Sequence, residues 1–192
     1  MRLLLLSGFL LVTTCLQAQS GSTTATAAAA HAPNPAFLNQ VYYYWSDSLF
    51  ACPKAEGQME NKIKAMGFGG SQMGYTMDGS KAALRIKAGD SLRFVVKMVT
   101  MGDPSSMLQL LRFESKKDSR QAVMSTQSRL GGNKGQKNQV PFDIQRSATD
   151  VFILIPSSRL SPGEYGFMNQ MMMKQSGTSV TYTFYTFGID PQ

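Results

Sequence analysis

Residues 151–165 of the chain read Val-Phe-Ile-Leu-Ile-Pro-Ser-Ser-Arg-Leu-Ser-Pro-Gly-Glu-Tyr, and this stretch decides the fold class. Its first five side chains are apolar without a polar break, which is typical of a central strand covered on both faces. The two prolines and the glycine that follow end the strand and turn the chain. The stretch therefore predicts two consecutive β-strands joined by a tight corner.

The rest of the folded region repeats this pattern of short strand-like runs separated by turns. In 91–98, Leu92, Phe94, Val96 and Met98 share one face while Arg93 and Lys97 point away, which indicates a half-buried strand. We find no amphipathic run of helical length. The sequence predicts an all-β fold of two packed antiparallel sheets with about ten strands. The expected strands are 41–46, 58–66, 69–77, 82–87, 91–99, 107–115, 121–127, 138–145, 151–155, 164–173 and 179–187, and the charge-rich end of 58–66 is alternatively a helical turn.

The corner sequence Leu160-Ser161-Pro162-Gly163-Glu164-Tyr165 predicts a type II turn, because proline and glycine occupy its two central positions. The Tyr165 hydroxyl is then placed to bond back across the corner. The motif resembles the tyrosine corner of immunoglobulin-like and fibronectin type III sandwiches. That resemblance implies a Greek-key, immunoglobulin-like sandwich and no particular activity.

A second resemblance covers the whole chain and rests on Gly67-Phe68-Gly69-Gly70, on Phe94-Val95-Val96 and on residues 162–167, Pro-Gly-Glu-Tyr-Gly-Phe. The chain is similar in these features to uncharacterised short secreted proteins of Gram-negative bacteria. The resemblance implies export and a sandwich form, and it carries no function.

The N-terminus has the layout of a secretory signal peptide. A basic Arg2 precedes an apolar run from Leu3 to Leu16, and the small residue Ala18 follows. The run is shorter than the ~20 residues that span a bilayer as a helix, so we expect no transmembrane segment once it is removed. The expected organisation is a signal peptide at 1–18, a flexible Ala/Thr/Pro leader at 19–35 and one β-sandwich domain at 36–192. The expected location is the periplasm, the outer envelope or the extracellular space.

The two cysteines leave alternatives open. Cys15 is a candidate lipidation site, although Val12-Thr13-Thr14 before it fits a lipoprotein signal poorly. If cleavage removes Cys15, Cys52 has no partner for an intramolecular disulfide. We interpret Cys52 as a small buried apolar residue.

Catalytic constellations are absent from the sequence. The only histidine, His31, lies in the leader, and the 12 acidic residues are scattered over turns without metal-ligand spacing. We therefore expect no enzyme activity, no cofactor and no metal.

Two surfaces are candidate binding sites. Tyr42-Tyr43-Tyr44-Trp45 places aromatic rings on both faces of one strand, so Tyr42, Tyr44 and Trp45 are candidates for stacking on sugar rings; the alternative is a strand packed on both sides. Basic residues gather along 116–137, where Gly131–Gly135 is expected to be an open loop, and Lys134 and Lys137 are candidates for binding an anionic polysaccharide. The alternative there is a solvated face. Nucleic acid is not expected, because no aromatic residue is interleaved with the charges.

The methionines of 168–173 raise a third possibility, Cu(I) binding by thioethers. Met171 and Met173 share one face of a strand and Met172 the other, so packing by Met168, Met171, Met172 and Met173 is the favoured interpretation.

The sequence as a whole predicts an exported, non-enzymatic β-sandwich that acts as a binding or envelope-structural module. The partner is unknown, with an envelope protein or an anionic polysaccharide as candidates. A carbohydrate binder that uses the aromatic strand, or a Cu(I) binder that uses the methionines, is the alternative.

We predict that the mature protein begins at Gln19 or within two residues of it, because Ala18 is the small residue nearest the end of the apolar run. N-terminal sequencing of the exported protein checks this. A mature chain that starts at a lipidated Cys15 would contradict it.

Overall fold

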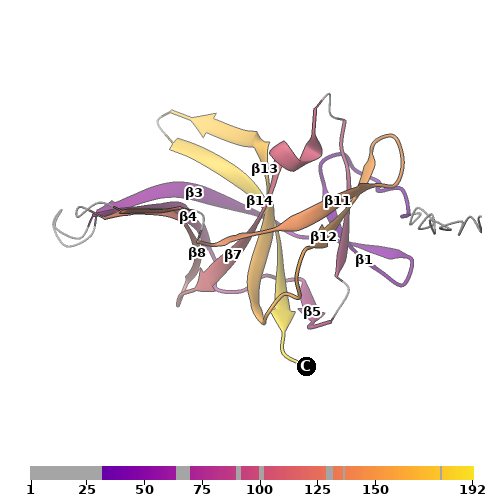
Figure 1. The fold of residues 1–192 in the computed structure, drawn as a ribbon, viewed down its shortest axis with the longest axis horizontal. Coiled ribbons are helices and arrows are strands. Elements are labelled where there is room, and N and C mark those ends of the chain that lie inside the picture. Colours follow the sequence, from indigo (N-terminus) through magenta and orange to yellow (C-terminus); the bar gives the residue numbers. More distant parts are fainter. Residues whose placement is uncertain are drawn as a thin grey trace, which may run out of the picture.

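The computed structural model describes residues 32–63, 70–89, 92–99, 102–128, 132–135, 137–177 and 179–192. Over these ranges the chain forms two β-sheets (Figure 1). The smaller sheet is antiparallel throughout. In spatial order its strands are β11 (Phe142–Arg146), β12 (Val151–Pro156), β6 (Arg93–Lys97), β1 (Val41–Trp45) and β2 (Ser48–Ala51).

The larger sheet closes on itself. Because β7 pairs with β8 as well as with β13, the strands β7, β13, β14, β3, β4 and β8 form a six-stranded barrel. In spatial order the sheet contains β10 (Gln139–Val140), β7 (Leu108–Ser115), β13 (Gly163–Ser176), β14 (Ser179–Asp190), β3 (Lys54–Ile63), β4 (Ser71–Asp78), β8 (Ser119–Ser128) and β9 (Gly132–Gly135). The short strand β5 (Arg85–Lys87) pairs with β14 in parallel.

Helical structure in the described ranges is limited to a 3₁₀ turn at Pro104–Ser106, which Asp103 caps by accepting from the Ser105 N–H. None of the helices described there is long and apolar enough to cross a membrane.

The expectation of an all-β, antiparallel protein is confirmed. Its arrangement differs from an open two-sheet sandwich, because the larger sheet curls into a barrel and only part of it faces the smaller sheet. Barrel closure pairs β7 with β8, so neither strand is left as an unpaired sheet edge along that segment.

Strands β7, β13 and β14 contribute buried side chains from both faces, in β13 over 164–169 and in β14 over 183–189. On one face Leu110, Phe167 and Phe187 pack against Phe94 and Phe152 of the smaller sheet, which makes the main core. On the other face the same three strands contribute to a second core inside the barrel, with residues Tyr75, Met77, Leu111, Phe113, Ala122, Met168 and Phe184. The three strands are thus a layer shared by a sandwich and a barrel.

The all-apolar stretch 151–155 is central, as predicted. Strand β12 lies between β11 and β6. Phe152 and Leu154 belong to the main core, whereas Val151 and Ile153 pack on the outer face of the smaller sheet together with Ala32. Ala32, a residue of the predicted leader, also donates its backbone N–H to the Ser147 hydroxyl over 2.9 Å.

The predicted strands differ from the structure in several places, and the described ranges contain fourteen strands rather than about ten. The expected strand 138–145 is divided into β10 and β11 at Pro141, which has no N–H to donate to a ladder. Strand β2 was not predicted. The expectation of an open loop over Gly131–Gly135 is wrong where the structure describes it, because the backbone of Gly132–Gly135 pairs with β8 as strand β9.

The corner at Pro162 forms with the predicted hydroxyl contact. Tyr165 is buried, and its hydroxyl donates to the Ser161 carbonyl oxygen over 2.8 Å. The predicted type II turn is wrong: Gly163 has a φ of 155° rather than the roughly +80° of that turn, because it already pairs with Ile189 in β13.

We predict that Tyr165→Phe lowers the free energy of unfolding by about 0.5–1.5 kcal/mol, the net contribution of one intramolecular hydrogen bond. Chemical denaturation measures this. Tyr75→Phe is the matched control, because that hydroxyl makes no hydrogen bond to the described residues and its ring lies in the barrel core. Equal losses in the two variants would contradict the role of the corner bond.

Candidate functional site

A tight hairpin between β1 and β2 presents the aromatic strand. Ser46 and Asp47 join the two strands and both have positive φ, 47° and 60°, which is the backbone of a two-residue type I′ turn. The Asp47 carboxylate accepts a hydrogen bond of 2.8 Å from the Tyr44 hydroxyl. This bond is the main cause that raises the pKa of Tyr44.

One face of this hairpin carries an aromatic group that we call the aromatic platform: Tyr43, Trp45 and Phe50. The Tyr43 and Trp45 rings stack with centroids 6.4 Å apart, and the Phe50 ring lies 6.3 Å from Tyr43. Tyr43 also contacts Phe94 of the main core, so the platform continues the core outward. Trp45 is 61% exposed and Phe50 is 46% exposed. The platform therefore offers ring faces to solvent from a rigid base.

The platform forms one wall of a cleft of about 590 Å³, here called the aromatic cleft. The facing wall comes from β5 and the residues after it. Most of the lining is apolar, and Arg85 and Lys87 are its charged residues; the full lining is Tyr43, Trp45, Arg85, Ile86, Lys87, Ala88, Gly89 and Leu92. An apolar cleft with a few polar groups at its rim is the usual form of a small-molecule site.

The sequence predicted this surface only in part. Trp45 is exposed as a platform residue requires, but Tyr42 is buried and Tyr44 packs on the opposite face with the outer cluster. Tyr43 and Phe50, rather than Tyr42 and Tyr44, form the platform with Trp45. The period of two along β1 pairs Tyr43 with Trp45, and this alternation was the available signal. Phe50 could be assigned to this surface only once strand β2 was known. The sequence does not indicate that hairpin, because its Ser46-Asp47 turn lacks the glycine that is usual there.

A second depression, of about 680 Å³, lies between the β7–β10 pair and the Pro162 corner, and we call it the basic groove. Its cationic lining residues are Arg112, Lys137 and Arg159. Arg112 donates to the Pro162 carbonyl oxygen over 3.3 Å, which holds its guanidinium across the corner. Glu114 also lines the groove and lies 3.8 Å from both Lys137 and Lys116.

Buried amides complete the basic groove. Asn138 is 7% exposed, and its Nδ2 donates to the Arg112 carbonyl oxygen over 2.9 Å. The Oδ1 of Asn138 and the Oε1 of Gln139 are buried without a hydrogen-bond partner among the described residues. Unpaired buried acceptors are costly, and a buried water is the usual partner for them in proteins.

The predicted basic surface is divided by the fold. Lys137 lines the basic groove and its side chain is 70% exposed. The backbone of Lys134, in β9, pairs with Thr126 of β8. The Lys134 side chain lies outside the described part of the structure. Arg120, another basic residue of 116–137, is 4% exposed and lies on the same face of β8 as Ala122 of the barrel core.

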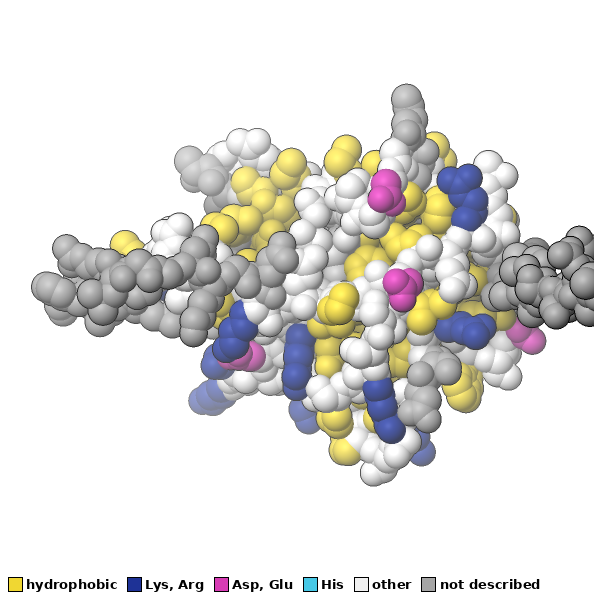
Figure 2. Space-filling view, in the orientation of Figure 1, with side chains coloured by type: hydrophobic (Ala, Val, Ile, Leu, Met, Phe, Trp, Pro, Cys, Tyr) yellow, Lys and Arg dark blue, Asp and Glu magenta, His cyan; other side chains and the backbone are white. Residues whose placement is uncertain are grey.

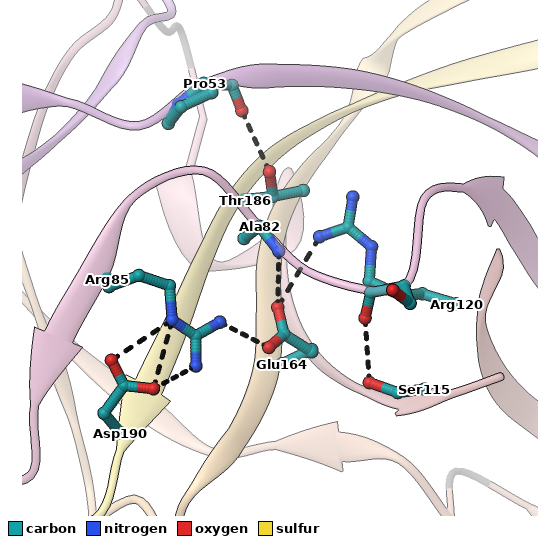
Figure 3. Close-up of polar contacts among 9 residues, drawn as sticks. Pro53, Ala82, Arg85, Ser115, Arg120, Glu164, Thr186 and Asp190 are labelled. Atoms are coloured by element: carbon teal, nitrogen blue, oxygen red, sulfur yellow. Dashed lines mark hydrogen bonds and ion pairs between the residues drawn. The ribbon is translucent and has the colours of Figure 1, made fainter. Parts of the chain in front are cut away.

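A buried ionic network closes the end of the barrel beside both depressions (Figure 3). Glu164 of β13 is its centre: it accepts from Arg85 and from the backbone N–H of Ala82, and it lies 3.7 Å from Arg120. Arg85 also forms a bidentate pair with Asp190 at the end of β14. Because Arg85 lines the aromatic cleft and Glu164 the basic groove, the network joins the walls of the two depressions.

The electrostatics of the network follow its geometry. Hydrogen bonds from Arg85 lower the pKa of Asp190, and the two carboxylates raise the pKa of Arg85. Burial lowers the pKa of Arg120. Gly188 is required for this arrangement, because a Cβ at that position would overlap the Arg85 guanidinium.

The methionines of 168–173 lie in different environments. Met168 is in the barrel core, whereas Met171 and Met173 are exposed on the β13–β14 hairpin, where Figure 2 shows apolar side chains. The Met172 sulfur accepts from the Tyr185 hydroxyl over 3.7 Å. The packing interpretation therefore holds for Met168 and is wrong for Met171 and Met173. No group of three or more His, Cys, Asp or Glu residues in the described ranges could hold a metal ion.

Cys52 is a core residue. It is 1% exposed, and burial raises the pKa of its thiol well above the usual range. A buried thiol held in its neutral form is a poor nucleophile.

No protein-family model matches the chain, and neither a curated protein nor a solved structure matches it. The candidate site therefore rests on its own geometry.

We predict that Asp190 contributes stability only where it is ionised. Its folded-state pKa lies below the unfolded value of about 3.9, so the contribution is present above about pH 4 and is lost as the pH falls through the folded value. Asp190→Asn should therefore destabilise the protein at pH 7 and do so less at pH 2.5, measured by denaturant midpoints. Asp118→Asn is the control, since that carboxylate pairs with no described cation. An equal loss at both pH values would contradict the assignment.

Proposed function

We propose that this protein is an exported, non-enzymatic binding module that holds carbohydrate on the aromatic platform. The observation that carries the proposal is the exposed Trp45 ring, stacked on Tyr43 at the lip of the aromatic cleft. A sugar ring presents an apolar C–H face that packs on an aromatic ring, and its hydroxyls bond to polar groups at the rim. Arg85 and Lys87 supply such groups in the cleft.

The rigidity of the site supports this proposal. The platform lies at the end of the smaller sheet, which packs on β7, β13 and β14 in a two-layer, sandwich-like arrangement. Tyr43 is anchored on Phe94, and the facing wall is tied to β14 through the pairing of β5. A preorganised site loses less conformational entropy when a ligand binds.

Export is supported by the sequence, and the absence of enzyme activity by the sequence and by the burial of Cys52. The N-terminal apolar run supports export to the periplasm, the outer envelope or beyond. Among described residues, the one cysteine is buried and its thiol pKa is raised, so it does not serve as a nucleophile. An envelope-structural role remains the alternative within the same proposal, and it predicts a protein partner in place of a sugar.

We predict a fluorescence response from the site itself, because Trp45 is the only tryptophan of the chain. Its emission should change saturably with at least one soluble hexasaccharide from a panel of neutral and acidic chains. Trp45→Ala should weaken that binding about tenfold or more in calorimetry, since truncating a central tryptophan commonly costs about 2 kcal/mol.

Phe37→Ala is the matched control. Phe37 is an exposed aromatic residue of similar size that does not line the described depressions, so its loss should leave the affinity unchanged. A panel without any saturable response would overturn the proposed function. Equal effects of Trp45→Ala and Phe37→Ala would remove the platform from it.

A further inference from the structure

The aromatic cleft and the basic groove adjoin each other. A third, smaller depression of about 120 Å³ shares Gly89 and Leu92 with the aromatic cleft. It shares Ser158, Arg159 and Leu160 with the basic groove. The three depressions therefore follow one another across the surface, and we call the whole series the composite groove. A series of open depressions accommodates an extended chain better than a single compact molecule.

Positive charge follows the composite groove along its length. Its cationic lining residues are Arg85, Lys87, Arg93, Arg112, Lys137 and Arg159, and its described acidic ones are Glu114 and Glu164. Glu164 is 4% exposed and pairs with Arg85 and Arg120, so it presents little charge to solvent. Because Arg85 also pairs with Asp190, most of the net positive charge comes from the other five cations. This cationic lining favours a ligand that carries repeated negative charges.

The same groove combines an aromatic ring with cationic groups. Trp45 is exposed in the aromatic cleft, and Arg112 and Lys137 line the basic groove. Simple phosphate or carboxylate ions have no ring to pack on Trp45. A ligand with both sugar rings and carboxylates fits the two kinds of protein group at once.

From these observations we infer that the composite groove binds an acidic polysaccharide, with one sugar ring on Trp45 and carboxylates of the following residues near Arg159, Arg112 and Lys137. This inference rests on the proposed carbohydrate function and names its ligand class. The aromatic cleft supplies stacking, and the basic groove distinguishes charged from neutral chains. Guanidinium groups suit this role, because they bind carboxylates through two parallel hydrogen bonds.

The test compares chains that differ only in charge. Hexasaccharides of galacturonate, of guluronate and of alternating glucuronate and N-acetylglucosamine are titrated by calorimetry, each beside its carboxyl-reduced neutral form. At least one acidic chain should bind about tenfold more tightly than its neutral form, as expected when a few exposed ion pairs each contribute up to about 1 kcal/mol. The preference should shrink as the salt concentration rises, because exposed charges are screened.

Substitutions in the groove test which residues cause the preference for acidic chains. Arg112→Gln with Lys137→Gln should abolish most of the difference in affinity between acidic and neutral chains. Lys62→Gln with Lys117→Gln removes the same charge outside the lining of the composite groove and serves as the control. Trp45→Ala should weaken both forms alike.

Each result decides between the two proposals. Equal binding of acidic and neutral chains, lost in Trp45→Ala, would overturn this inference and leave the proposed function intact. Binding of neither form would overturn both. A single-stranded oligothymidylate that binds as tightly as the acidic chains, and depends on Arg112 and Lys137, would show that the groove selects polyanions without regard to sugar and would overturn the assigned class.

Discussion

Burial of β7, β13 and β14 on both faces is the constraint on which the rest of the structure depends. These strands must satisfy two cores at once, with Phe167 and Phe187 against the smaller sheet and Met168 and Phe184 inside the barrel. The barrel closes on one side of this layer, while the smaller sheet covers the other and extends past it at the β1–β2 hairpin. The exposed platform of Tyr43, Trp45 and Phe50 is the part of that inner surface which the shared layer leaves uncovered.

The polar network at Glu164 fixes the same layer at its end. A buried carboxylate is tolerated only when it is paired and hydrogen-bonded, and Glu164 obtains its partners from β5, from the segment before it and from β8. The consequence reaches the surface, because Arg85 holds β5 where it forms a wall of the aromatic cleft. Gly188 belongs to this constraint, since any side chain there would displace the guanidinium.

The sequence correctly predicts the features that depend on neighbouring residues in the chain. The alternation of Leu92, Phe94 and Val96, the all-apolar strand at 151–155 and the Tyr165 corner all follow from neighbouring side chains. Barrel closure did not follow, because the pairing of β7 with β8 depends on curvature and on contacts distant in sequence. Strand β9 was missed because backbone pairing needs no apolar side chain. Of the candidate site residues, Trp45 lines the aromatic cleft and Lys137 the basic groove. Tyr42 is buried, and its burial depends on the packing of the whole sheet, which the local sequence does not determine.

A map of ligand contacts would test the account most directly. Backbone amide chemical shifts of the labelled protein, followed while an acidic hexasaccharide is added, report which residues meet it. We expect the changes to gather at 43–50, 85–93, 112, 137–139 and 158–163, in one continuous band. Changes confined to the exposed methionines of the β13–β14 hairpin, or spread over the barrel without the platform, would contradict the assignment of the composite groove as the binding site.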